Sequence, residues 1–193
     1  GVPDANVIAE PCKRNTAGAL AYAAAHMLAT YDSDGTDITM AVLTADQLIE
    51  QPDLFRATVA AALEAAEREN ALATMGIVPT RPETGYGYIQ IAQGAEALPG
   101  IPGGISVYPV TAFHEKPNRE QAEDFIAMGR YFWNGGMFFW TISVFLQELA
   151  AANPKYAQAT RDMTEAMKSG DSAKVDSLFE GLENISIDYA LME

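Results

Sequence analysis

The chain has 193 residues, of which 49% are hydrophobic and 20% charged, so it has enough apolar side chains to bury a core and is not a disordered chain. Its 26 acidic residues outnumber 12 basic ones, and the formal net charge of -14 argues against nucleic acid and anionic membranes as partners. The single cysteine, Cys12, excludes an internal disulfide, and no apolar run of about 18 residues and no basic, apolar leader is seen. We therefore expect a cytoplasmic protein.

Segments typical of helices and strands alternate along the sequence. Capping residues and helical spacing of apolar residues predict helices, and short apolar runs between turn residues predict strands. In chain order we expect a helix at 15–29, a strand at 40–43, a helix at 52–70, strands within 73–80, 85–93 and 105–116, and helices at 119–128, 141–153, 156–171 and 172–183. Asn118 and Gln121 fit a capping box for the third helix. This alternation predicts an α/β fold with a mostly parallel sheet.

Two acidic motifs follow predicted strands. Asp46 lies in TADQ, just after the strand at 40–43, where open α/β sheets bind their ligands. It is either a metal ligand or the cap of the next helix. Glu115 and Lys116 lie in FHEKP at the end of another strand, where neighbouring side chains point to opposite faces. We therefore expect that they do not form a simple salt bridge with each other, and the alternative to a functional role is an ordinary surface pair.

Glycine and asparagine residues mark two further stretches. Gly85 and Gly87 alternate with tyrosines in RPETGYGYI, which indicates either a close approach of the backbone to a ligand or an ordinary bulge. Asn134 is a single amide among aromatic residues in FWNGGMFFW. A buried asparagine must be satisfied, so its partner is either the backbone or a polar ligand.

A polar segment precedes the first predicted helix. The stretch EPCKRNTA carries Glu10, Arg14, Asn15 and Thr16 immediately before a run of small residues. One interpretation is a binding loop at the start of the helix, and the other is a helix cap beside an exposed glutamate.

Six motifs in this order resemble one enzyme family. EPCKRNTAGA, VLTADQ, RPETGYGYI, FHEKPN, WNGGMF and SIDYALME together are similar to the central part of the mannose-1-phosphate guanylyltransferases, bacterial sugar nucleotidyltransferases, from about Val7 to Glu193. The resemblance implies a Rossmann-like three-layer nucleotidyltransferase fold. It also implies transfer of GMP from GTP to mannose 1-phosphate, which yields GDP-mannose and pyrophosphate.

The resemblance also assigns roles to particular residues. Asp46 and Asp188 would hold Mg²⁺ against the nucleotide phosphates, which fits an ion that takes one or two carboxylates plus substrate oxygens. Around the mannose, Gly87 would act through its backbone, and Glu115 and Asn134 would bind hydroxyls. Lys116 would bind the sugar phosphate and is the candidate catalytic residue. Gln47 and Gly135 depart from the family pattern, which commonly has histidine and serine there.

The polar segment at 10–16 would bind the nucleotide by the same resemblance. Guanine presents two donors, N1–H and N2–H₂, on one edge, and a carboxylate such as Glu10 accepts both. By analogy with base readout in DNA, a bidentate pair contributes about 1–3 kcal/mol of discrimination. Arg14, Asn15 and Thr16 would then place the base and start the helix.

One element of the family is absent from the sequence. The glycine-rich phosphate loop, of the pattern GGxGxRLxPxS, and the strand before it would lie upstream of these motifs. We therefore expect residues 1–193 to form a single nucleotidyltransferase domain that is incomplete at its N-terminus and incompetent in catalysis by itself. An open sheet edge would favour a homo-oligomer. The alternatives are a non-catalytic fragment that binds nucleotide or sugar phosphate, and a nucleotidyltransferase for another sugar phosphate.

Overall fold

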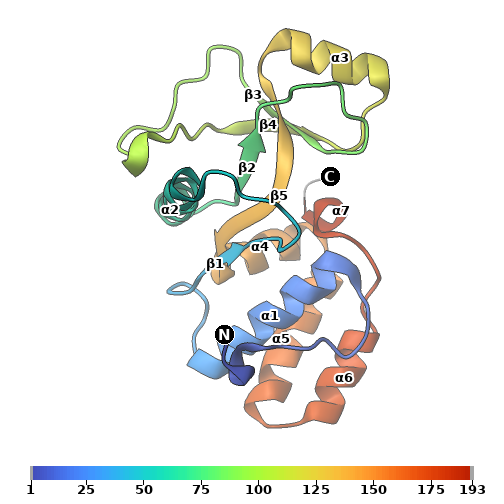
Figure 1. The fold of residues 1–193 in the computed structure, drawn as a ribbon. Coiled ribbons are helices and arrows are strands. Elements are labelled where there is room, and N and C mark those ends of the chain that lie inside the picture. The colour runs from blue at the N-terminus through green and yellow to red at the C-terminus, as the bar shows by residue number, and fades with distance from the viewer. Residues whose placement is uncertain (1, 192–193) are drawn as a thin grey trace. The chain divides into compact units, whose positions relative to one another are not determined.

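A computed structural model describes residues 2–191 and shows an α/β fold (Figure 1). The chain divides into two compact units. Within the described residues, unit 1 comprises residues 2–38 and 142–191 and consists of helices, and unit 2 comprises residues 39–141 and contains the sheet. The expectation of one domain stays a prediction. None of the described helices is both long enough and apolar enough to cross a membrane.

Unit 2 contains five strands, two α-helices and a short 3-10 helix. The strands are β1 (Thr39–Val42), β2 (Ala73–Ile77), β3 (Tyr88–Ile91), β4 (Val110–His114) and β5 (Tyr131–Thr141). The helices are α2 (Pro52–Glu69), α3 (Arg119–Met128) and the 3-10 helix η2 (Pro102–Gly104). The bounds of α2 and α3 confirm the two helices predicted for this unit. The ends of β1 to β4 differ from the predicted ends by one to several residues.

The sheet is organised around β5. β1 and β2 both pair with Phe138 and Phe139 of β5, so they lie on its two sides, while β3 pairs with the first residues of β5 and β4 pairs with β3. Every pairing among the described strands is antiparallel, so the expectation of a mostly parallel sheet is wrong for these pairings. β1, β2 and β3 do run in one direction, but each contacts the reversed strand β5 rather than the others.

The central strand β5 contains the segment FWNGGMFFW, for which the sequence predicted no strand. Asn134, Gly135 and Gly136 are residues typical of a turn, so the sequence pattern does not indicate that a strand runs through them. The chain continues through this point because Gly136 adopts a φ of 66°, and the register with β2 shifts between Thr74 and Gly76. Such a bulge re-aims nearby side chains.

Helices of unit 2 cover the sheet with small and aromatic residues. Ala62 and Ala66 of α2 pack against Met137 and Phe139 of β5, with Phe55, Val59 and Leu63 partly buried beside them. On α3, the side chain of Asn118 accepts a hydrogen bond from the N–H of Gln121, and the side chain of Gln121 accepts one from the N–H of Asn118. The predicted capping box is therefore confirmed.

Unit 1 is a group of helices, seen around α1 and α5 in Figure 1. It contains η1 (Asp4–Asn6), α1 (Asn15–Tyr31), α4 (Ile142–Ala152), α5 (Pro154–Lys168), α6 (Ser172–Glu180) and α7 (Ile187–Leu191). α1 packs against α5, and its small residues Ala21, Ala24 and Ala25 are fully buried. Small side chains allow close approach of the helices and explain the alanine-rich sequence.

Candidate functional site

The predicted sugar-phosphate residues meet in unit 2. The N–H of Asn134 donates to the carbonyl oxygen of Gly87 at 2.8 Å, which joins the GYG segment to the middle of β5. This bond extends the pairing of β3 with β5 by one step beyond Tyr88 and Trp133. Two motifs that are far apart in the sequence are thus adjacent.

Gly87 also touches the carboxylate of Glu115. A β-carbon at position 87 would lie 2.7 Å from Glu115 Oε2 and 2.7 Å from Phe113 Cζ, closer than side chains tolerate. The groups that approach Gly87 are thus side chains of the protein, one of them the carboxylate of Glu115, and the predicted approach of a ligand to this backbone stays a prediction.

Glu115 and Lys116 form an ion pair, with 2.8 Å between Lys116 Nζ and Glu115 Oε1. The expectation that they could not pair is wrong. It assumed strand geometry, but β4 ends at His114 and Lys116 has a φ of 46°, which turns its side chain toward its neighbour. The side chain of Glu115 is 12% exposed and that of Lys116 is 56% exposed, so the carboxylate is mostly covered by the protein while the ammonium group faces solvent.

The side-chain oxygen of Asn134 is bound to the protein. Asn134 Oδ1 accepts hydrogen bonds from the hydroxyl of Thr74 at 3.0 Å and from the N–H of Gly136 at 3.3 Å. Thr74 lies on β2, and its hydroxyl also contacts the carbonyl oxygen of Met137 at 2.9 Å. The amide is therefore held in one orientation by β2 and by the bulge of β5.

The TADQ loop reaches the same part of β5. Gln47 Nε2 donates to the carbonyl oxygen of Gly135 at 2.9 Å, while Asp46 is exposed. Gln47 thus attaches the loop that carries Asp46 to the residue that follows Asn134. Asp46 does not cap α2, whose N-cap is Gln51, so the capping interpretation is not supported.

The loop before Gly87 is ordered by its own hydrogen bonds. Tyr88 Oη donates to the carbonyl oxygen of Glu83 and accepts from its N–H, at 2.9 and 3.0 Å. The N–H of Gly85 and the guanidinium of Arg81 hold the pKa of the Glu83 carboxyl below its ordinary value. Arg81 also lies over the ring of Trp133 at 5.4 Å from its centroid. These contacts hold the segment 81–86, which leads into the candidate site at Gly87.

The remaining predicted residues lie in unit 1. Thr16 Oγ1 accepts a hydrogen bond from the N–H of Ile187 at 2.8 Å, so Thr16 lies beside the residue that precedes Asp188. Asn15 Oδ1 accepts from the N–H of Thr16 at 2.9 Å. Arg14 donates to the carbonyl oxygen of Glu180, and Arg14 Nε is buried without a hydrogen-bond partner among the described residues. The two predicted motifs at 14–16 and 188 therefore meet.

Glu10 differs from its neighbours in this motif. It is exposed, and it makes no hydrogen bond or ion pair within residues 2–191. Its carboxylate is thus accessible to a ligand, as base recognition requires. The geometry is equally that of an ordinary surface glutamate, so its role stays a prediction.

The predicted residues therefore form two groups in different units. Unit 2 brings together Gly87, Glu115, Lys116 and Asn134, with the Asp46 loop attached, and unit 1 brings Arg14, Asn15 and Thr16 to the segment that carries Asp188. The convergence of Asp46 and Asp188 on one ion stays a prediction. Within the described part of the chain, no three acidic, histidine or cysteine residues cluster as a metal site would need. Only a site completed by substrate oxygens fits this donor set.

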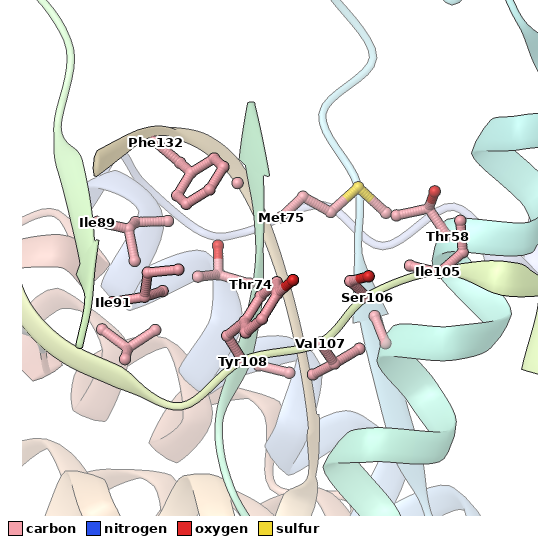
Figure 2. Close-up of a pocket in the computed structure, with 14 residues that line it drawn as sticks. Thr58, Thr74, Met75, Ile89, Ile91, Ile105, Ser106, Val107, Tyr108 and Phe132 are labelled. Atoms are coloured by element: carbon pink, nitrogen blue, oxygen red, sulfur yellow. The ribbon is translucent and has the colours of Figure 1, made fainter. Parts of the chain in front are cut away.

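An apolar cavity of about 330 Å³ also lies in unit 2 (Figure 2). Its lining comes from α2, from all strands of the unit except β1, and from the segment around Ser106 and Tyr108, and it contains no charged residue. The predicted ligand, a sugar phosphate, would carry charge and need a cation, which the Glu115–Lys116 pair offers and this cavity does not. The candidate functional site is therefore the group around Gly87 and Asn134.

Sequence reasoning did not predict the contributions of Thr74 and Gln47. A threonine in a strand is ordinary, so the sequence carried no signal for Thr74. The sequence shows Gln47 as a departure from the family pattern beside Asp46, but it does not predict the contact with Gly135. What it contacts depends on β5, the strand that the sequence did not reveal.

Unit 2 thus combines an antiparallel sheet with a cluster of glycine, carboxylate, lysine and amide groups, which suits polar and charged ligands. Comparison with known proteins gives the class, because the profile of the nucleotidyl transferase family matches residues 3–177. The chain belongs to this family of enzymes.

Its relatives narrow the class further. Over 190 residues the chain is 40% identical to a mannose-1-phosphate guanylyltransferase of Klebsiella pneumoniae, in a match that covers 97% of this chain and 38% of that protein. It is 38% identical over 189 residues to the alginate biosynthesis protein AlgA of Pseudomonas aeruginosa, in a match that covers 97% of this chain and 37% of that protein. The chain thus spans less than two-fifths of the length of these curated relatives.

A solved structure has a similar fold. The crystal structure described as a mannose-1-phosphate geranyltransferase from Thermus thermophilus matches 96% of this chain and 49% of its own, with a TM-score of 0.76 and 33% identity. The nucleotidyltransferase fold expected from the sequence is confirmed, apart from the direction of strand pairing.

Proposed function

We propose that this chain is the nucleotidyltransferase region of a mannose-1-phosphate guanylyltransferase. A phosphate oxygen of mannose 1-phosphate attacks the α-phosphorus of GTP, one P–O bond forms, and the bond to the leaving pyrophosphate breaks. The observation that carries the proposal is the cluster of Gly87, Glu115, Lys116 and Asn134 in unit 2. The similarity to guanylyltransferases supplies the substrates.

The residues of the cluster suit a sugar phosphate. The exposed ammonium group of Lys116 would bind the phosphate, and the mostly covered carboxylate of Glu115 would fix that ammonium while accepting from a sugar hydroxyl. Asn134 would bind a second hydroxyl, and the tight contact at Gly87 leaves room only for backbone there. Positioning and charge neutralisation carry most of the rate in such transfers, and these groups are already connected before substrate binds.

Magnesium would be held by Asp46 and Asp188 together with the phosphates of GTP. When bound, the ion would offset the negative charge of the substrates on a chain whose own formal charge is -14. The contribution of the chain is to place each carboxylate. Gln47 holds the Asp46 loop on β5, and the bond from Ile187 to Thr16 holds the start of α7.

The base would be recognised by Glu10. Its exposed carboxylate would accept from the N1–H and N2–H₂ groups of guanine, while adenine, which lacks a proton on N1, would leave it unpaired. In this proposal Arg14 and Thr16 mainly secure the loop, because their side chains already bind Glu180 and Ile187.

The test is product formation by the full-length protein. With GTP, mannose 1-phosphate and Mg²⁺, we expect GDP-mannose and pyrophosphate in equal amounts, detected by ion-exchange chromatography and a coupled pyrophosphate assay. A chelator should abolish both products and added Mg²⁺ should restore them. Equal turnover of glucose 1-phosphate, or equal use of ATP, would contradict the proposed substrates.

A further inference from the structure

Thr74 is connected to the candidate site only through another side chain. Its hydroxyl lies 3.0 Å from Asn134 Oδ1 and 2.9 Å from the carbonyl oxygen of Met137. It comes from β2, and the register shift between β2 and β5 begins at this residue. Thr74 therefore bridges both sides of the bulge at Asn134–Met137.

The hydrogen bonds around Asn134 define which way its amide points. The N–H of Gly136 can only donate, so the Asn134 atom that faces it at 3.3 Å must be the oxygen. Thr74 contacts this same oxygen, and the Met137 carbonyl can only accept, so the single hydroxyl proton is shared between two acceptors. The hydroxyl of Thr74 and the N–H of Gly136 therefore both donate to Asn134 Oδ1, so Nδ2 points away from these two donors.

The surroundings of Thr74 strengthen this arrangement. Thr74 lines the apolar cavity of unit 2 together with Ile89, Tyr108 and Phe132, which surround it in Figure 2. A hydrogen bond in an apolar environment is electrostatically stronger than one in water, and losing a partner there is costly.

We propose that Thr74 is the positioning residue that orients the amide of Asn134 for a sugar hydroxyl. The inference rests on the proposed function, since it takes Asn134 as a ligand of mannose 1-phosphate. Thr74 itself touches no substrate. It acts by holding Oδ1, so that Nδ2 is the face of the amide presented to the sugar.

The experiment compares Thr74→Val with Thr74→Ser by calorimetric titration of mannose 1-phosphate into the protein. Valine keeps the shape of the side chain and removes the hydroxyl, whereas serine keeps the hydroxyl. We expect valine to weaken binding about fivefold and serine to stay within about twofold of wild type. Both substitutions are repeated in an Asn134→Ala background, where valine should have no further effect on affinity.

Thermal unfolding of each variant separates positioning from folding, because a merely structural role lowers the Tm and weakens binding equally in both backgrounds. Such additivity, or wild-type affinity in Thr74→Val, overturns the inference while leaving the proposed function intact. Failure of the wild-type protein to bind mannose 1-phosphate overturns the proposed function, and the inference with it.

Discussion

The two groups of candidate residues are held in different ways. In unit 2 the sugar-phosphate residues contact one another, with Gly87 against Glu115, Glu115 paired with Lys116, and Gly87 bonded to Asn134. In unit 1 the candidate base-binding residues Asn15 and Thr16 share a bond between sequence neighbours, while the side chains of Arg14 and Thr16 bind the scaffold at Glu180 and Ile187. Contacts within a group indicate a preorganised site, whereas contacts to the scaffold indicate support for one.

Lys116→Met tests the unit 2 group most severely. The substitution removes the cation that faces the phosphate and leaves the mostly covered carboxylate of Glu115 without this partner. Charged hydrogen bonds contribute about 1.5–3 kcal/mol, so we expect a loss of roughly 10- to 100-fold in affinity for mannose 1-phosphate by calorimetry. Arg119→Gln is the matched control, because Arg119 is an exposed cation in the same unit. An equal loss in both variants would show that only general charge matters.

Gly87→Ala tests the close contact between the GYG segment and Glu115. The added methyl group would lie 2.7 Å from Glu115 Oε2 and 2.7 Å from Phe113 Cζ, so the carboxylate and the ring, or the backbone itself, must shift. We expect the free energy of unfolding to fall by about 1–3 kcal/mol, with a loss of sugar-phosphate affinity.

Gly85→Ala is its control in the same loop, since a methyl group there would meet only Glu83 Oε1 at an ordinary 3.5 Å. Urea unfolding of both variants measures the difference. If Gly87→Ala is as stable as Gly85→Ala and binds as wild type does, the contact at Gly87 is not part of a site.

Glu10→Gln tests whether the unit 1 group recognises the base of the nucleotide. Because Glu10 is exposed and has no partner within the described residues, its substitution should leave thermal stability unchanged. If it binds guanine, the preference for GTP over ATP should fall about tenfold in competition binding. Glu148→Gln, another exposed glutamate in unit 1, should leave the preference intact. An unchanged preference in Glu10→Gln would refute the assignment.

Tyr156→Phe has the smallest expected effect and reports on the scaffold of unit 1. Burial, aided by the charge of Glu183, raises the pKa of Tyr156 to about 12. The ordinary pKa is 10.0, so the stabilisation linked to this shift is complete below pH 10 and is lost as the pH rises toward about 12. Wild-type stability should therefore decline over this range, and the decline should be shallower in Tyr156→Phe.

The exposed Tyr31 supplies the control for that measurement. Tyr31→Phe should follow the wild-type pH dependence in urea unfolding. If Tyr156→Phe declines as steeply as wild type, the buried hydroxyl is not the source of the pH dependence.

The sequence predicted the helices well because their signals are local. The capping box of α3 and the proline that opens α2 lie within the elements they start. β5 could not be predicted, since Asn134–Gly136 imitates a turn and the strand depends on pairing with β1, β2 and β3. The prediction of a mostly parallel sheet was wrong for the same reason, because without β5 the strands β1, β2 and β3 had only one another as partners.

The candidate site shows the same limit. Its residue types were predictable from the motifs, but their contacts were not. The ion pair of Glu115 with Lys116 depends on a left-handed backbone at position 116, and the role of Thr74 depends on the bulge in β5. Both are products of tertiary structure that no local pattern encodes.

The most direct test of the central claim is a titration of mannose 1-phosphate followed by ¹⁵N–¹H NMR of residues 1–193. If the unit 2 group is the sugar-phosphate site, the backbone signals of Gly87, Glu115, Lys116 and Asn134 should shift together and saturate. Saturable shifts confined to other residues, or no saturable shift at all, would contradict it.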